Sequence, residues 1–211
     1  MKKLLLDIII FSSLNSFGQS LPTFKTMVSW EDKINIKDDI NFGIGDDGIN
    51  RIEEPMIKTS SKLYNNSNSF RAENISDYNL ATPWISSNKN NGIGESIEII
   101  YDFKNRPNNK NAISINSLFI INGYRTNIKQ WKNYARIKKL KMSINNKPFA
   151  YVLLKDTYKF QWIDFPDYWL KYGHTWAIKL EIIEVYNGNK YGNTAISEIQ
   201  FEGKYSENTI K

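Results

Sequence analysis

Apolar and polar residues alternate along much of the chain after residue 58, with the period of two that a half-buried β-strand produces. In residues 97–103, the apolar side chains of Ile97, Ile99 and Tyr101 occupy every second position. Residues 115–121 are almost wholly apolar, which is typical of a central strand. Further strands are predicted at residues 139–144, 149–153, 160–165, 176–185 and 196–202. No segment has a helical period, so the pattern predicts an all-β domain.

The order of these strands predicts which loops meet. If successive strands cross a sandwich in opposite directions, starting with Ser60 to Tyr64, the connecting loops alternate between its two ends. One end then holds loops 65–95, 122–135, 155–157 and 186–195, and the other holds loops 104–114, 145–148 and 166–175 with both domain termini. The two longest loops, 65–95 and 122–135, therefore share one end with loop 186–195. We expect this end to carry the function, since a rigid scaffold positions functional loops.

The first residues have the pattern of a secretory signal. Lys2 and Lys3 precede a short apolar stretch from Leu4 to Leu14, and small residues follow before Gln19. The stretch is too short to span a bilayer. We predict a signal peptide over residues 1–19 and a secreted or periplasmic protein, with an amphipathic strand or helix as the alternative. Residues 20–57 are interpreted as an extension or a hairpin that turns at Asp47-Gly48.

Composition supports a single packed domain. The chain has 211 residues, of which 41% are hydrophobic and 14% aromatic, which supplies enough apolar surface for one core. Cysteine is absent, and its absence excludes disulfides, thiol catalysis and cysteine-ligated zinc.

The net charge of +6 is spread along the chain. The one dense basic patch contains Arg136, Lys138, Lys139 and Lys141. On a strand, Lys139 and Lys141 project to the side opposite to Lys138, which divides the patch. We therefore interpret it as a solvated edge strand and expect no nucleic-acid partner, since nucleic-acid recognition needs a patch on one face.

Five short runs resemble one family. The run from Asn74 to Trp84 resembles the "NLxDGxxxTxW" run of discoidin-like, factor V/VIII type C modules. Four more runs resemble the NADase-type glycan-binding domain, named for the translocation domain of NAD glycohydrolase. They are Gly92 to Glu95, Asn122 to Tyr124, Asn133 to Lys138, and Tyr186 to Tyr191 followed by Thr194 to Ile199. Together they cover residues 58–204, which leaves 205–211 as a tail.

The resemblance implies a discoidin-like jelly-roll β-sandwich, of the galactose-binding-domain type, with carbohydrate recognition on its loops. It does not imply NADase activity, because the catalytic domain of that enzyme is a separate one. Two residues depart from the family pattern. Asp77-Tyr78 replaces an Asp-Gly pair, so the turn loses the glycine that adopts a positive φ most easily, and Asn193 replaces an aspartate.

The shared loop end suggests a set of ligand-binding residues. Aromatic faces stack on the C–H face of a sugar, while amide and cationic groups hydrogen-bond its hydroxyls. The predicted aromatic residues are Tyr124, Trp131, Tyr134 and Tyr191, and the predicted polar residues are Asn122, Asn133, Arg136 and Lys190. We expect Trp131 to be exposed because polar and basic residues flank it. Packing of the loops is the alternative for each of these residues.

A second group suggests a calcium site. Asp77, Asn79 and Thr82 offer hard oxygen ligands in a tight loop, and the strand order places Glu198 beside it. Related discoidin-like lectins often hold a structural ion at the matching place. The alternative is an Asx-turn with Glu198 hydrogen-bonded to loop amides, and the residues do not distinguish the two.

Catalytic signals are weak. His174 is the only histidine, and the strand order places it at the far end. We assign Trp84 and Trp176 to the core. We therefore predict non-catalytic glycan binding. A surface module that docks another protein is the first alternative, and a carboxylate-based glycoside hydrolase is the second.

Overall fold

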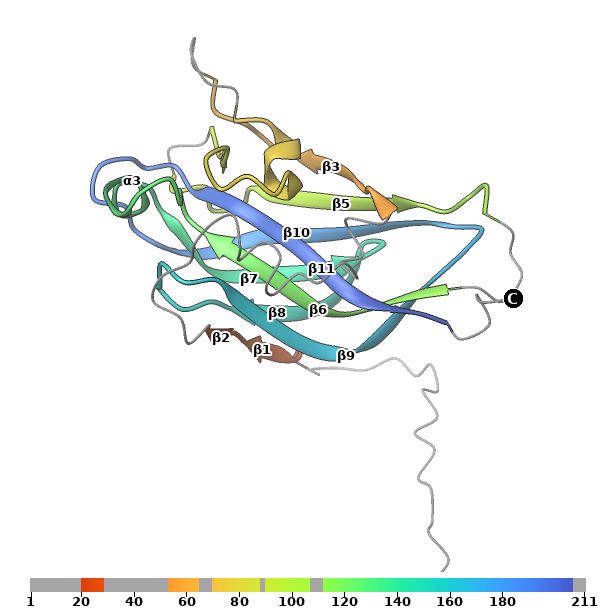
Figure 1. Ribbon diagram of the computed structural model, residues 1–211. Coiled ribbons are helices and arrows are strands. Elements are labelled where there is room, and N and C mark those ends of the chain that lie inside the picture. Colours follow the sequence, from red (N-terminus) through yellow and green to blue (C-terminus); the bar gives the residue numbers. More distant parts are fainter. Residues whose placement is uncertain (1–19, 29–52, 65–69, 88–89, 107–111, 207–211) are drawn as a thin grey trace, which may run out of the picture.

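The computed structural model describes residues 20–28, 53–64, 70–87, 90–106 and 112–206. These residues form mainly β-strands in two layers (Figure 1). The strands are β1 (Thr23–Lys25), β2 (Met27–Val28), β3 (Met56–Thr59), β4 (Trp84–Ile85), β5 (Ser96–Asp102), β6 (Ala112–Asn122), β7 (Arg136–Ile144), β8 (Lys147–Leu153), β9 (Gln161–Lys171), β10 (Thr175–Tyr186) and β11 (Ala195–Tyr205). A 3-10 helix, η1, spans Ala72–Ser76, and a short α-helix, α3, spans Ile128–Asn133. The predicted all-β sandwich is confirmed.

The first sheet has the order β1-β8-β7-β10-β5-β3, and the second has the order β2-β9-β6-β11-β4. All pairs are antiparallel except β1 with β8. β1 and β2 lie at one edge of different sheets, so the short segment that contains both closes that edge. Thr26 lies between them, where its hydroxyl donates to Gln161 Oε1 at 2.7 Å and its backbone N–H donates to the Leu153 carbonyl.

The interior forms from alternating strands, as in β5. Ile97, Ile99 and Tyr101 are fully buried while the residues between them face outward. Trp84, assigned to the core from the sequence, is also fully buried, and its indole N–H donates to the Ser61 carbonyl at 2.8 Å. These side chains fill the space between the two sheets. The loops that connect the strands lie at the two ends of the sandwich.

The strands predicted from the sequence are less accurate at the edges of the two sheets. The strand that leads into the domain is Met56–Thr59 and not Ser60 to Tyr64. Part of the presumed N-terminal extension forms β1 and β2 within the sandwich. The Asp47-Gly48 turn and residues 1–19 lie outside the described residues.

Glu53 fixes the approach to β3 at the far end of the sandwich. Its side chain is almost fully buried and accepts hydrogen bonds from Arg106 at 3.1 Å and from the Tyr205 hydroxyl at 2.8 Å. The Arg106 guanidinium also lies 5.1 Å from the Phe103 ring centroid and 5.2 Å from that of Tyr172. This cluster ties the beginning of β3 to β11 and to the end of β5.

Candidate functional site

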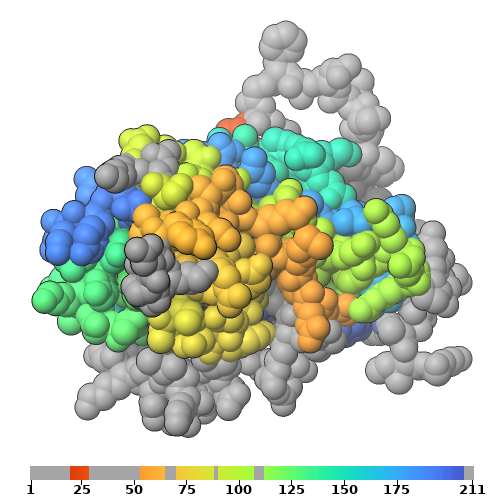
Figure 2. All heavy atoms as spheres, turned by 90° about the horizontal axis from the view of Figure 1, so that it is seen from above, coloured from red at the N-terminus to blue at the C-terminus, as the bar shows by residue number. Residues whose placement is uncertain are grey.

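Loops from distant parts of the sequence interlock at one end of the sandwich, which we call the rim (described residues of 70–95, 122–135, 155–160 and 186–195). The backbone N–H of Asn189 donates to the Lys132 carbonyl at 2.8 Å, and that of Tyr191 donates to the Asn133 carbonyl at 2.9 Å. The backbone N–H of Asn91 donates to the Gly192 carbonyl at 3.1 Å. Loops 122–135 and 186–195 lie side by side in both overall views (Figures 1 and 2). The predicted meeting of the long loops is confirmed.

Gly188 permits the closest approach of these loops. A Cβ atom at this position would lie 2.5 Å from the carbonyl carbon of Tyr134 and 2.8 Å from the backbone nitrogen of Ala135. Both are backbone atoms, which have little freedom to move aside. The rim therefore needs a residue without a side chain where the two loops cross.

Trp131 is a correction to the sequence interpretation. Its side chain is 8% exposed, and its indole N–H donates to the Asn122 carbonyl at 2.9 Å. The polar residues on either side of it belong to α3, which Asn127 caps by accepting from the backbone N–H of Gln130. In a helix, sequence neighbours point in different directions, so their polarity does not determine the environment of Trp131. The expectation of an exposed indole is wrong.

Arg136 is also buried, with 6% of its surface exposed. Its guanidinium donates to the two carboxylate oxygens of Asp156 at 2.8 and 3.0 Å, and to the Tyr134 carbonyl at 2.8 Å. It also lies 4.5 Å from the Trp131 ring centroid. A guanidinium has five N–H donors, and these contacts occupy most of them. The expectation that Arg136 faces a ligand does not fit this geometry.

Asn122 has a similar structural position. Its amide oxygen accepts from the Ile137 backbone N–H at 2.9 Å, and its amide nitrogen donates to the Ile137 carbonyl at 2.7 Å. Only 2% of its surface is exposed. The rim loops are therefore held in place by three buried side chains, those of Asn122, Trp131 and Arg136.

The other predicted ligand-binding residues have accessible surface. Tyr124, Tyr134 and Tyr191 are half-buried and form a row, with ring centroids 5.5 Å apart for the first pair and 4.6 Å for the second. Phe70, which the sequence did not single out, packs edge-on against Tyr124 at 6.3 Å. Burial raises the pKa of the Tyr134 hydroxyl, so the central ring of the row is uncharged at neutral pH.

Lys190 and Asn133 border this row. The Lys190 side chain is exposed, and its ammonium lies 5.0 Å from the Tyr191 ring centroid. Asn133 is half-buried, and its carbonyl accepts from the backbone N–H groups of Lys190 and Tyr191. The rim thus presents aromatic rings beside an ammonium and an amide, on a backbone that hydrogen bonds hold together.

The predicted calcium ligands lie in a compact turn after η1. Asp77 accepts from the Asn79 backbone N–H at 2.9 Å and from the Thr82 hydroxyl at 2.6 Å. Glu198, almost fully buried, accepts from the Tyr78 backbone N–H at 3.2 Å and from the Gln200 amide at 2.5 Å. Burial raises the pKa of the Glu198 carboxyl well above its usual range. These contacts match the Asx-turn alternative, and calcium binding stays a prediction.

Tyr78 occupies the position where the family has glycine, and it does adopt a positive φ of 58°. Such a conformation costs a bulky residue roughly 1–3 kcal/mol. Its backbone N–H is bonded to Glu198, and its hydroxyl donates to Gln200 Oε1 at 3.3 Å. These contacts to β11 hold the turn in the conformation that glycine would adopt more easily.

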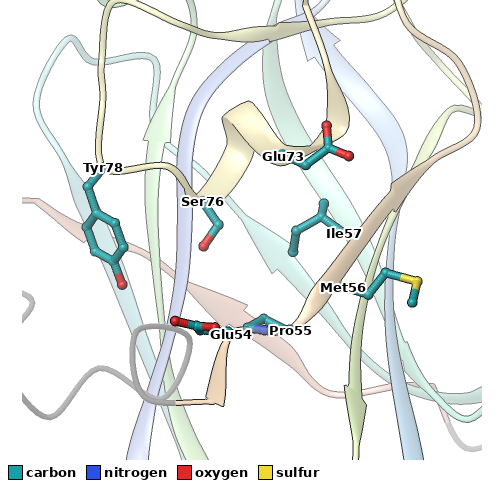
Figure 3. A pocket seen from close by; sticks show the side chains of 7 residues that line it. All are labelled: Glu54, Pro55, Met56, Ile57, Glu73, Ser76 and Tyr78. Atoms are coloured by element: carbon teal, nitrogen blue, oxygen red, sulfur yellow. The ribbon is translucent and has the colours of Figure 1, made fainter.

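A hollow of about 410 Å³ lies between β3 and η1 (Figure 3). Glu54, Met56, Glu73, Ser76 and Tyr78 are among its lining residues. Met56 is 58% exposed beside it. The space-filling view shows this face, where β3 and the segment of η1 lie next to each other (Figure 2). None of the three tyrosines of the aromatic row lines the hollow.

The remaining sequence candidates are peripheral. His174 lies in the turn between β9 and β10, at the opposite end from the rim, and Trp176 is half-buried at the edge of the core. Within the described residues, no group of three or more His, Asp or Glu side chains is arranged to hold a metal ion. No helix in this part of the chain is long and apolar enough to cross a membrane.

The described residues thus form a two-layer β-sandwich whose long loops meet at one rim. Residues 51–202 match the model of the NAD glycohydrolase translocation F5/8 type C domain, and the chain belongs to that family. Comparison with curated proteins gives no match.

Solved structures support the same fold. The chain is similar to the CBM32-1 and CBM32-2 domains of Clostridium perfringens ZmpB in complex with GalNAc, with 13% identity and a TM-score of 0.57 over 90% of this chain and 42% of that one. It is also similar to CBM32-3 from a family 31 glycoside hydrolase of Clostridium perfringens, with 14% identity and a TM-score of 0.53 over 75% of this chain and 96% of that one. The chain spans less than half the length of the ZmpB structure. At such identities, the likeness concerns the fold.

Proposed function

We propose that the rim binds a glycan and that the domain is a non-catalytic, exported carbohydrate-binding module. The observation that carries the proposal is the row of Tyr124, Tyr134 and Tyr191 on interlocked loops. Half-exposed aromatic rings on a rigid support bind the apolar face of a pyranose with little loss of side-chain entropy. A solved relative of similar fold is a complex with GalNAc, which supports this ligand class.

The buried framework supports the same proposal. Trp131 and Arg136 fix loop 122–135 before any ligand arrives, so binding does not require ordering of this loop. The structure also offers Asn133 and Lys190 as hydrogen-bonding groups beside the rings. Such a mixture of apolar faces and a few polar groups is usual for sites that bind small sugars.

A glycan array followed by calorimetry tests the proposal. Tyr191→Ala should weaken binding by about 1–2 kcal/mol, which is the value of one aromatic contact with its area. Tyr151→Ala is the matched control, because Tyr151 is a half-buried tyrosine on the outer face of the first sheet, under Lys139. Absence of binding to any glycan, or equal loss in both variants, would reject the rim as a glycan site.

A protein-docking module is the alternative use of the same rim. Free sugar should displace a glycan but should leave a docked protein in place, so competition separates the two functions. The non-catalytic assignment predicts that bound glycans are recovered uncleaved. Export predicts that protein from the native host lacks roughly residues 1–19, as mass spectrometry would show.

A further inference from the structure

The two loops that carry the aromatic row have an unbalanced charge. Residues 122–135 and 187–194 contain four basic residues and no acidic residue. The basic residues are Arg125, Lys129, Lys132 and Lys190. Arg125 is 5% exposed and its guanidinium lies 3.4 Å from the Tyr158 ring centroid, so it contributes to the field but offers no accessible contact. The other three side chains are exposed.

Two carboxylates on segments next to these loops are already paired. Asp156, on the neighbouring loop, accepts two hydrogen bonds from Arg136. Glu184, near the end of β10, lies 2.8 Å from the Lys138 ammonium, and this contact lowers the pKa of the Glu184 carboxyl. Neither carboxylate is therefore available to balance the exposed lysines of the two loops.

The exposed lysines of the two loops, Lys129, Lys132 and Lys190, have no such carboxylate partner among the described residues. No carboxylate in the described part of the chain lies within 4.0 Å of their ammonium groups. Lys132 and Lys190 come from different loops, and the hydrogen bond from Asn189 to the Lys132 carbonyl brings their backbones together. Lys190 lies over Tyr191, and the Tyr191 ring is 4.6 Å from that of Tyr134. The loops bearing these cations therefore border the aromatic row.

We infer that the preferred ligand of the rim is an anionic glycan, whose pyranose rings contact the tyrosines while its carboxylate or sulfate groups contact Lys132 and Lys190. The inference rests on the proposed function and specifies its substrate class. An exposed ion pair raises affinity only about two- to five-fold, and salt screens it over about 10 Å at 0.1 M. Two such contacts should therefore produce a preference of about ten-fold at low salt.

The test uses pairs of glycans that differ only by one sialic acid or by one sulfate ester, measured by calorimetry in about 50 and 300 mM salt. Each anionic member should bind about ten-fold tighter than its neutral partner at low salt, and the difference should shrink at high salt. Lys132→Gln and Lys190→Gln should each reduce this preference about two- to five-fold, and Lys132→Gln should leave binding of the neutral partner unchanged. The sialylated and sulfated arms distinguish the two kinds of acidic group.

Lys179→Gln is the matched control. It removes the same charge from the outer face of the first sheet, where Lys179 pairs with Glu98 in the strand register. Equal reduction by Lys179→Gln and Lys132→Gln would reveal general attraction to a basic protein and would overturn the inference. Equal affinity for neutral and anionic members would overturn it too, while leaving the proposed glycan binding intact. Absence of binding to both members would overturn the inference and the proposed function together.

Discussion

The indole N–H of Trp131 donates to the Asn122 carbonyl at 2.9 Å, which ties the middle of α3 to the end of β6. The same indole approaches Gly123, where a Cβ atom would lie 2.5 Å from Trp131 Cδ1. Trp131 is therefore packed on the strand that leads into its own loop. Trp131, which the sequence indicated as the residue that stacks on a sugar, instead stabilises the conformation of its own loop.

Replacement of Trp131 should consequently affect stability. Trp131→Ala removes a buried ring and leaves the Asn122 carbonyl without its indole donor, so it should lower the free energy of unfolding by about 3–5 kcal/mol. Urea denaturation measures the change. Trp169→Ala is the control, because Trp169 is 37% exposed, and its effect should stay within about 0.5 kcal/mol. Similar small losses for both variants would contradict the burial of Trp131.

Gly188 should link loop spacing to ligand binding. Gly188→Ala places a methyl group against the backbone of residues 133–135, and relief of that contact requires the loops to separate. We expect a loss of about 1–3 kcal/mol in stability and a fall of at least ten-fold in glycan affinity. Thermal unfolding and calorimetry provide the two measurements.

Gly94→Ala is the comparison for that variant. Gly94 has a φ of 86°, but in the described part of the chain no atom beyond its two sequence neighbours lies within 4 Å of where its Cβ would be. It should therefore lose roughly 1–3 kcal/mol from backbone strain alone, with unchanged glycan affinity. Equal effects of the two variants on affinity would show that the spacing of the loops does not matter.

The buried carboxyl of Glu198 should make the free energy of unfolding depend on pH when chelator is present. Burial raises the pKa of its carboxyl in the folded state well above the ordinary value of 4.5. The folded state then holds its proton more tightly than the unfolded state. Its contribution to stability is complete below the unfolded pKa and is lost as pH rises through the folded pKa.

Between pH 4 and pH 8, Glu198→Gln should remove this contribution to the slope of the free energy of unfolding against pH. Urea denaturation at several pH values measures that slope. Glu181→Gln, on the outer face of the first sheet, should retain the slope of the unaltered protein. If Glu198→Gln also retains it, the carboxyl does not titrate as its burial requires.

Calcium binding by Asp77, Asn79, Thr82 and Glu198 makes a separate prediction. A ligand that binds only the folded state stabilises it by mass action, so chelator should lower the melting temperature and calcium should restore it. The Glu198→Gln variant should not respond. An unchanged melting curve in chelator would favour the Asx-turn, whose hydrogen bonds the structure shows.

The alternation in β5 predicts that strand and its buried face, because every second residue packs against the other sheet. It predicts β8 incompletely. Phe149, Tyr151 and Leu153 are the large apolar residues of that segment, yet Ala150 and Val152 are the buried ones. A register shift in the pairing of β7 with β8 between Met142 and Ser143 leaves Phe149 at the bulge, where it packs against Phe165 and Tyr168.

The rim shows the same limit. Strand order predicts which loops meet, because it depends only on chain direction. It does not predict α3, since six residues are too few to reveal a helical period, and without α3 the orientation of Trp131 is lost. Strand order also does not show that the Arg136 guanidinium donates two hydrogen bonds to the carboxylate of Asp156, which is 20 residues away in the sequence. Tertiary partners therefore decide which rim residues remain accessible.

The position of β11 affects the order in which the domain can form. It is the last described strand, yet it lies inside the second sheet between β6 and β4, where Ile196 pairs with Asn122 and with Trp84. During synthesis, β6 and β4 leave the ribosome long before the strand that separates them. Neither strand can form its native pairing with β11 until residues 195–205 emerge, so the rim loops next to β11 reach their final positions only after that. Completion of the fold is consequently a late event, coupled to the end of translation of this domain.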